Sequence, residues 1–193
     1  MPLKIYLLGQ FKLLANDTPF DLPSRPAQSL LAFLALNAGT VQRREKLASM
    51  LWPDTTESNA RSYLRQALWR IRKAFEAHSL PCEDFLDITD ILMTFKHQSD
   101  HWLDVDAVLK TTKDQSIEQI AENLQHYQGE LLPGFYDEWI LPERERLQAA
   151  FHQKMTLLLD KLTDAKKWNE AIDWSEHWIR HGFTPESAFR ALM

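Results

Sequence analysis

The chain has 193 residues, of which 45% are hydrophobic and 25% are charged, and its formal net charge is −5. This composition excludes a disordered or fibrous chain and is ordinary for a globular protein of one large or two small domains. The single cysteine, Cys82, excludes an internal disulfide and is typical of a reducing cytoplasm. Because no uncharged run reaches the roughly 18 residues of a membrane span and no signal-peptide pattern opens the chain, we expect a cytoplasmic protein without a membrane partner.

Residues 3–22 are predicted to form a small antiparallel sheet. The stretch "LKIYLLGQFKLL" is rich in strand-forming residues and carries Gly9 near its middle. A turn signal, "NDTP", follows at 16–19, and Pro23 and Ser24 end the sheet. The chain therefore opens with β-structure ahead of its first helical pattern.

Three helices are predicted next, at 25–37, 43–52 and about 55–77. Pro26 suits the first turn of the first helix, and Pro53 closes the second. The stretch "DTTE" at 54–57 has the pattern of a capping box at the start of the third helix, with Asp54 as the cap. A β-hairpin is predicted at 85–95, so the order of elements is that of a winged helix-turn-helix preceded by a sheet.

The third helix carries positive charge along one face. Within "SNARSYLRQALWRIRKAF", residues 58–75, there are five basic side chains and no carboxylate. Because no carboxylate lies between Glu57 and Glu76, we expect the row to lack neutralising ion pairs along the helix and to suit a polyanionic partner. At 100° per residue the apolar side chains gather on one side and the basic and polar ones on the other, namely Arg61, Ser62, Arg65, Gln66, Trp69, Arg72 and Lys73.

The second half is predicted to be all helix. Residues 1–97 hold 12 basic and 10 acidic side chains, whereas residues 98–193 hold 10 and 17, which indicates two modules with different partners. We therefore predict a winged-helix domain at 1–98 and a helical domain at 99–193, which we expect to be truncated because Met193 falls inside a helical pattern. Its helices are expected near 104–111, 116–127, 136–165 with Pro142 as a point of weakness, 168–181 and 185–193.

Several stretches resemble one family of bacterial regulators. "LPSRPAQSLLAFLALNAGT", "REKLASMLWPD" and "ARSYLRQALWRIRKAF" resemble the OmpR-type winged helix of the SARP family of transcriptional activators. "YQGELLPGFYDEW", "ERERL" and "ESAFRALM" resemble that family's bacterial transcriptional activator domain, a helical bundle related to tetratricopeptide repeats. The resemblance covers the chain from about Leu3 to Met193. Trp69 departs from it, because the family commonly has a small or polar residue there.

The resemblance implies a mainly α fold with small β elements and a sequence-specific DNA-binding activator. Its third helix would lie in the major groove of double-stranded DNA, on direct repeats near promoters. The helical domain would orient the winged helix, pair copies as a dimer on DNA, or contact the RNA polymerase holoenzyme.

Side chains of the basic face are assigned to two kinds of DNA contact. Arginine meets guanine in the major groove with two hydrogen bonds, so we predict base contacts by Arg61, Ser62, Arg65 and Gln66. Cations beyond the point where a straight helix leaves the curving groove suit phosphate. We predict phosphate contacts by Arg25, Arg43, Arg44, Trp69, Arg72, Lys73 and Lys96. For Arg44, pairing with Glu45 or exposure to water is an equal alternative.

The sequence shows no sign of an enzyme, and we expect no cofactor and no metal. His177 and His181 are four residues apart but lack the further ligands that zinc requires. No glycine-rich phosphate loop is present. We expect the aromatic side chains Phe135, Tyr136, Trp139 and Trp168 to be core residues. The alternative function is a protein-interaction scaffold in signalling, whose winged helix no longer binds DNA.

Overall fold

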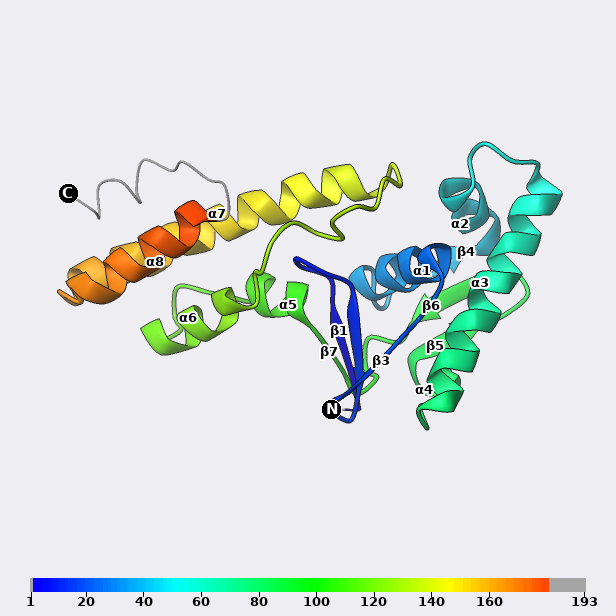
Figure 1. Cartoon of the computed structure of the whole chain (residues 1–193), viewed down its shortest axis with the longest axis horizontal. Coiled ribbons are helices and arrows are strands. Elements are labelled where there is room, and N and C mark those ends of the chain that lie inside the picture. The colour runs from blue at the N-terminus through cyan, green and yellow to red at the C-terminus, as the bar shows by residue number, and fades with distance from the viewer. Residues whose placement is uncertain (1, 181–193) are drawn as a thin grey trace. The chain divides into compact units, whose positions relative to one another are not determined.

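The computed structural model describes residues 2–180, and Figure 1 shows the order of their helices and strands. These residues form two compact units. Of the described residues, the first unit contains Pro2–Leu7, Phe11–Leu103 and the later segment Gly134–Leu141. Its main run ends a few residues after the predicted boundary at 98. The predicted helix 185–193 and His181 lie outside the described residues.

A four-stranded sheet opens the first unit, in the order β3-β2-β1-β7. The first three strands are antiparallel, as predicted, and a turn at Asn16 and Asp17, both with positive φ, joins β2 to β3. The fourth strand pairs parallel with β1 and was not predicted, because three residues carry too little pattern to mark a strand. The strands are β1 (Leu3–Tyr6), β2 (Lys12–Ala15), β3 (Thr18–Phe20) and β7 (His101–Leu103).

Three helices follow at the predicted places: α1 (Arg25–Leu36), α2 (Arg44–Leu51) and α3 (Glu57–Ala77). Thr56, not Asp54, caps α3, because its hydroxyl accepts from the backbone N–H of Asn59 at 3.4 Å. The helices pack through the apolar faces that their periodicity predicts, while Met50 and Ala74 are only half-buried. The buried side chains of α3 are Ala60, Leu64, Ala67, Leu68, Ile71 and Phe75.

A second, three-stranded antiparallel sheet completes the winged helix. The predicted hairpin is present as β5 (Leu86–Ile88) and β6 (Leu92–Phe95). A two-residue strand, β4 (Gln42–Arg43), pairs with β6, and a short helix, α4 (Cys82–Phe85), precedes the hairpin. Since β4 leads directly into α2, the hairpin is fixed against the start of that helix.

The segment Gly134–Leu141 packs on α1 although about 100 residues separate them in sequence. The indole N–H of Trp139 donates to the hydroxyl of Ser29 at 3.2 Å, and its ring meets Phe33 edge-on at 5.2 Å. The guanidinium of Arg25 lies 4.8 Å from the ring centre of Phe135. The segment Gly134–Leu141 is therefore part of the core of the winged unit.

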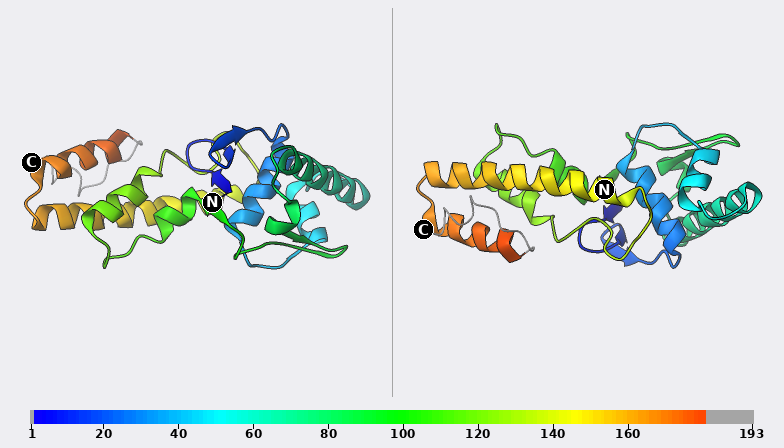
Figure 2. Two further views of the ribbon diagram at one scale, coloured as in Figure 1. Left: turned by 90° about the horizontal axis from the view of Figure 1, so that it is seen from below. Right: turned by 90° about the horizontal axis from the view of Figure 1, so that it is seen from above.

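Of the described residues, the second unit contains Leu8–Gln10, Asp104–Pro133 and Pro142–Arg180. Gly9 lies in the left-handed region at φ 82°, and a Cβ there would stand 2.7 Å from the carbonyl oxygen of Gln128, so only glycine fits. Figures 1 and 2 show α7 and α8 side by side as a hairpin. The helices are α5 (Asp104–Leu109), α6 (Ile117–Gln125), α7 (Ile140–Asp164) and α8 (Trp168–Arg180).

Two expectations for the second half are wrong. The long helix begins at Ile140 rather than 136, so Pro142 falls in its first turn, where a missing N–H breaks no helical bond. Phe135 and Trp139 are buried, but Tyr136 is 88% exposed and Trp168 is 55% exposed.

Within residues 2–180, no helix combines the length and the apolar character that crossing a membrane requires.

Candidate nucleic-acid interface

Two neighbouring depressions lie between α2, α3 and the β5–β6 hairpin and gather most of the predicted contact residues. Because Arg44 and Arg65 line both depressions, we treat them as one surface and call it the basic groove. The first depression, of about 460 Å³, is lined by Arg43, Arg44, Glu45, Arg61, Leu64, Arg65, Asp90 and Ile91. The second is lined by Arg44, Ser62, Arg65, Gln66, Leu68, Trp69, Arg72 and Ile88.

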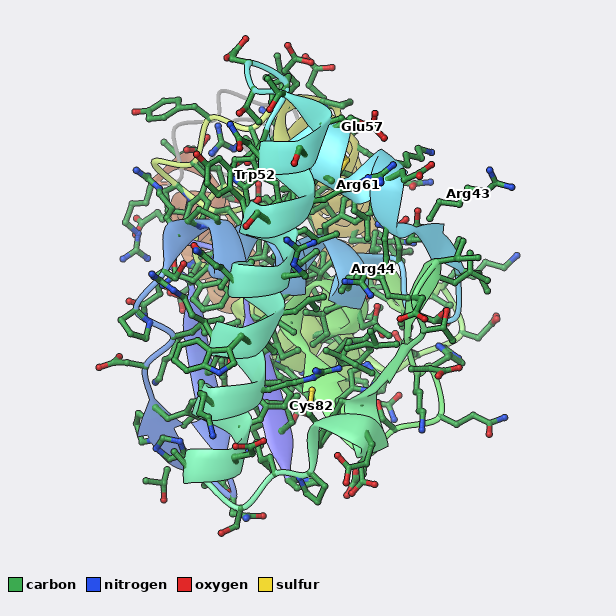
Figure 3. The ribbon with its side chains drawn as sticks, turned by 90° about the vertical axis from the view of Figure 1, so that its right-hand side faces the viewer. Arg43, Arg44, Trp52, Glu57, Arg61 and Cys82 are labelled. Carbon is green, nitrogen blue, oxygen red and sulfur yellow. The ribbon has the colours of Figure 1, made fainter. Side chains whose placement is uncertain are left out.

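Arg44 joins the helices to the hairpin. Its Nη1 donates to the carbonyl oxygen of Thr89 at 2.8 Å, and its backbone N–H donates to the carbonyl oxygen of Ile91 at 2.9 Å. Figure 3 shows Arg44 between α3 and the hairpin, while Arg43 is directed away from the protein. Arg44 therefore does not form the alternative pair with Glu45; its charge faces the groove from a fixed position.

Arg61 is held by two carboxylates. Its Nη2 donates to Glu45 at 2.8 Å and also to Glu57, one turn earlier on α3 (Figure 3). Lys73 likewise pairs with Glu76 at 2.9 Å. The expectation that the row lacks neutralising ion pairs is wrong at these two positions. The carboxylates that bracket the row at 57 and 76 reach into it, and Glu45 approaches from α2.

The middle of the row is open to solvent. Arg65, Gln66 and Trp69 are exposed and Ser62 is half-buried. Among the ion pairs of residues 2–180, none involves Arg65 or Arg72. These two arginines therefore present charges to solvent that a ligand anion would pair with.

Arg72 also lies next to the buried Cys82. Burial raises the pKa of the Cys82 thiol, and the nearby Arg72 guanidinium opposes that rise in part. A further depression, lined in part by Arg72, Cys82 and Lys96, extends from this point. Lys96 donates from Nζ to the carbonyl oxygen of Glu83 at 2.6 Å, so its charge lies beside α4, at the end of the hairpin away from its turn.

Three predicted contact residues do not line the basic groove, namely Arg25, Lys73 and Lys96. Arg25 lies over the rings of Phe135 and Tyr136, at 4.8 and 6.0 Å from their centres. Lys73 lines neither depression. The groove also contains side chains that the sequence did not single out, chiefly Glu45 and Ile91. Both arrive through long-range packing, although the exposed apolar tip residue of a hairpin is a signal that could have marked Ile91.

The groove has the chemistry of an anion-binding surface. Five arginines and two carboxylates line it, and its floor includes the apolar side chains of Leu64, Leu68 and Ile88. Guanidinium groups form two-pronged hydrogen bonds with phosphate and with the guanine edge. Within the described part of the chain, no group of three or more His, Cys, Asp or Glu side chains is placed to hold a metal ion.

Comparison with solved structures gives one informative likeness. EmbR of Mycobacterium tuberculosis, solved in complex with a low-affinity phosphopeptide, matches with a TM-score of 0.82 at 16% sequence identity. The match covers 99% of this chain and 53% of the EmbR chain, so the present chain spans about half the length of EmbR. No family model and no curated protein matches the sequence. At this identity the likeness shows the fold: a winged domain and a helical domain, as in EmbR, a SARP-family regulator.

Proposed function

We propose that this protein is a transcription regulator that binds double-stranded DNA through the basic groove. The observation that carries the proposal is the gathering of five arginines from β4, α2 and α3 around one surface beside a hairpin wing. The shared fold with a SARP-family regulator supports the same reading. An OmpR-type winged helix, activation of promoters and a cytoplasmic location are part of this proposal.

The dimensions of α3 suit the major groove. Its 21 residues extend over roughly 31 Å, and a B-DNA major groove of about 12 Å admits one helix. Arg65, with Ser62 and Gln66 beside it, would face base edges. Arg61 would do so after exchanging a carboxylate for a guanine edge, since an exposed ion pair contributes only about 0–1 kcal/mol.

Other groove cations would neutralise the DNA backbone. Arg43 ends β4 and Arg44 starts α2 beside the hairpin, and Arg72 lies toward the end of α3. Lys96, which lies outside the groove at the open end of the hairpin, would add a further contact. Arg25 and Lys73 remain predicted phosphate contacts, although they lie outside the groove, and their charges are the first to test separately.

The helical unit would act on protein partners rather than on DNA. The acidic excess of the second half disfavours contact with phosphates. The α7–α8 hairpin has the paired-helix form of tetratricopeptide-like repeats, which bind proteins. We therefore propose that this unit orients the winged helix, pairs copies on direct repeats or contacts RNA polymerase.

Selection from a random double-stranded DNA pool tests the proposal. We expect an enriched motif, a specific affinity that falls steeply with salt, and a weaker, equally salt-dependent affinity for unrelated DNA. Failure to enrich any motif, together with binding no stronger than that of an Arg65→Ala, Arg72→Ala double variant, would contradict it. That result would favour the protein-interaction scaffold instead.

A further inference from the structure

Trp69 is the one large apolar side chain at the centre of the exposed face of α3. It is 60% exposed, whereas Trp139 and Trp178 are buried. On the helical wheel it lies between Gln66 and Lys73 on one side and Arg65 and Arg72 on the other, opposite the buried face. Among residues 2–180, no ring stacking, cation–π contact or hydrogen bond involves Trp69. None of these three kinds of contact within the described chain accounts for a tryptophan at this position.

The surroundings of Trp69 indicate what it would contact. It shares its depression with Arg65 and Arg72, which come one turn before and one turn after it, and with the apolar side chains of Leu68 and Ile88. Of the two cations, Arg65 suits a guanine edge and Arg72 a backbone phosphate of the same duplex. An apolar ring between them suits an apolar feature on the groove floor, and the C5-methyl group of thymine is the one such feature on a base edge in the major groove.

We propose that Trp69 is a specificity-determining residue that packs against thymine methyl groups, so that the protein prefers thymine at one or two adjacent positions of its site. This inference rests on the proposed function, because it places α3 in the major groove. Such a contact would add apolar readout to the arginine contacts with guanine. The indole would bury much of its exposed surface against the base edges. Because a single side chain makes the contact, only one or two adjacent base pairs would be affected.

Replacing thymine by uracil tests the proposal, because this removes the methyl group alone. On the motif selected by the wild-type protein, each thymine is changed to uracil in turn, and the affinity of wild type and of Trp69→Ala is measured. We expect uracil at one or two neighbouring positions to weaken the wild type about three- to fivefold, as the loss of one buried methyl predicts. The same replacements of thymine by uracil should leave the affinity of Trp69→Ala unchanged.

Trp168→Ala is the matched control, because Trp168 is 55% exposed on α8 of the other unit. It should show the wild-type uracil profile. A profile in Trp69→Ala that matches the wild type at every thymine would overturn the inference and leave Trp69 as a backbone contact. That outcome is distinct from failure of the proposed function, in which the wild-type protein itself selects no DNA motif. Equal far-ultraviolet circular dichroism of the two variants checks that both fold.

Discussion

Arg61 on α3 donates a hydrogen bond to Glu45 on α2 at 2.8 Å, across the junction of the two helices that line the basic groove. The same guanidinium nitrogen also donates to Glu57. The groove therefore carries less positive charge than its arginines alone would give. Because all three side chains are about half or more exposed, this pairing is weak enough for DNA to displace.

Removing Glu45 should strengthen binding to DNA of any sequence. In Glu45→Ala we expect affinity for unrelated DNA to rise about two- to fivefold at low salt, because a repelling carboxylate leaves the interface and Arg61 gains freedom to pair with phosphate. Stability should change by no more than about 0.5 kcal/mol. Fluorescence anisotropy over a salt series measures the affinity. Glu170→Ala, on α8, is the control and should not alter the affinity for DNA. A Glu45→Ala protein that binds DNA more weakly than the wild type would contradict the prediction.

Arg65 and Lys73 should differ in how they affect specificity. Arg65→Ala should weaken binding to the selected motif by about 1–3 kcal/mol and relax the preference at one base pair, because Arg65 lines both depressions of the groove. Lys73→Ala should weaken binding to all DNA sequences by the same factor. Titrations of motif and scrambled DNA at matched salt measure both effects. An Arg65→Ala protein with unchanged affinity and selectivity would refute the base-contact assignment.

Trp139 should matter for the stability of the winged unit. It is 9% exposed and bonded to Ser29 on α1, so Trp139→Ala should lower the free energy of unfolding by about 3–5 kcal/mol. Tyr136, three residues earlier and 88% exposed, is the control, and Tyr136→Ala should cost less than about 1 kcal/mol. Urea denaturation followed by circular dichroism compares them. Equal losses in the two variants would show that the segment Gly134–Leu141 does not support α1.

These contacts show where sequence reasoning reaches its limit. The helices α1, α2 and α3 and the basic row were predictable, because helical periodicity and capping act over a few residues. The parallel pairing of β7 with β1 and the docking of Trp139 on α1 join residues about 100 apart. The pairing of Arg61 with Glu45 depends on the packing of α2 against α3. Local pattern carries no signal for such partners, so the sequence suggested an unpaired cation at 61.

The pair formed by His152 on α7 and Trp178 on α8 should make the second unit sensitive to acid. The indole N–H of Trp178 donates to Nδ1 of His152 at 3.2 Å, which requires that nitrogen to be unprotonated. Burial lowers the pKa of His152 below its ordinary value of 6.5. Between the lowered pKa and 6.5 the unfolded chain binds more protons than the folded chain, so the stability present above pH 6.5 is lost as the pH falls through that window.

His152→Gln separates this pair from other titrating groups, because a glutamine oxygen can accept from Trp178 without binding a proton. We expect the urea concentration at the unfolding midpoint of the wild type to decrease as the pH is lowered from about 7.5 to about 5.5. The decrease should be smaller in His152→Gln. His126, whose pKa burial also lowers, accounts for part of the fall that remains, so His126→Gln should remove a separate share. An identical fall in wild type and His152→Gln would show that protonation of His152 does not weaken the α7–α8 contact.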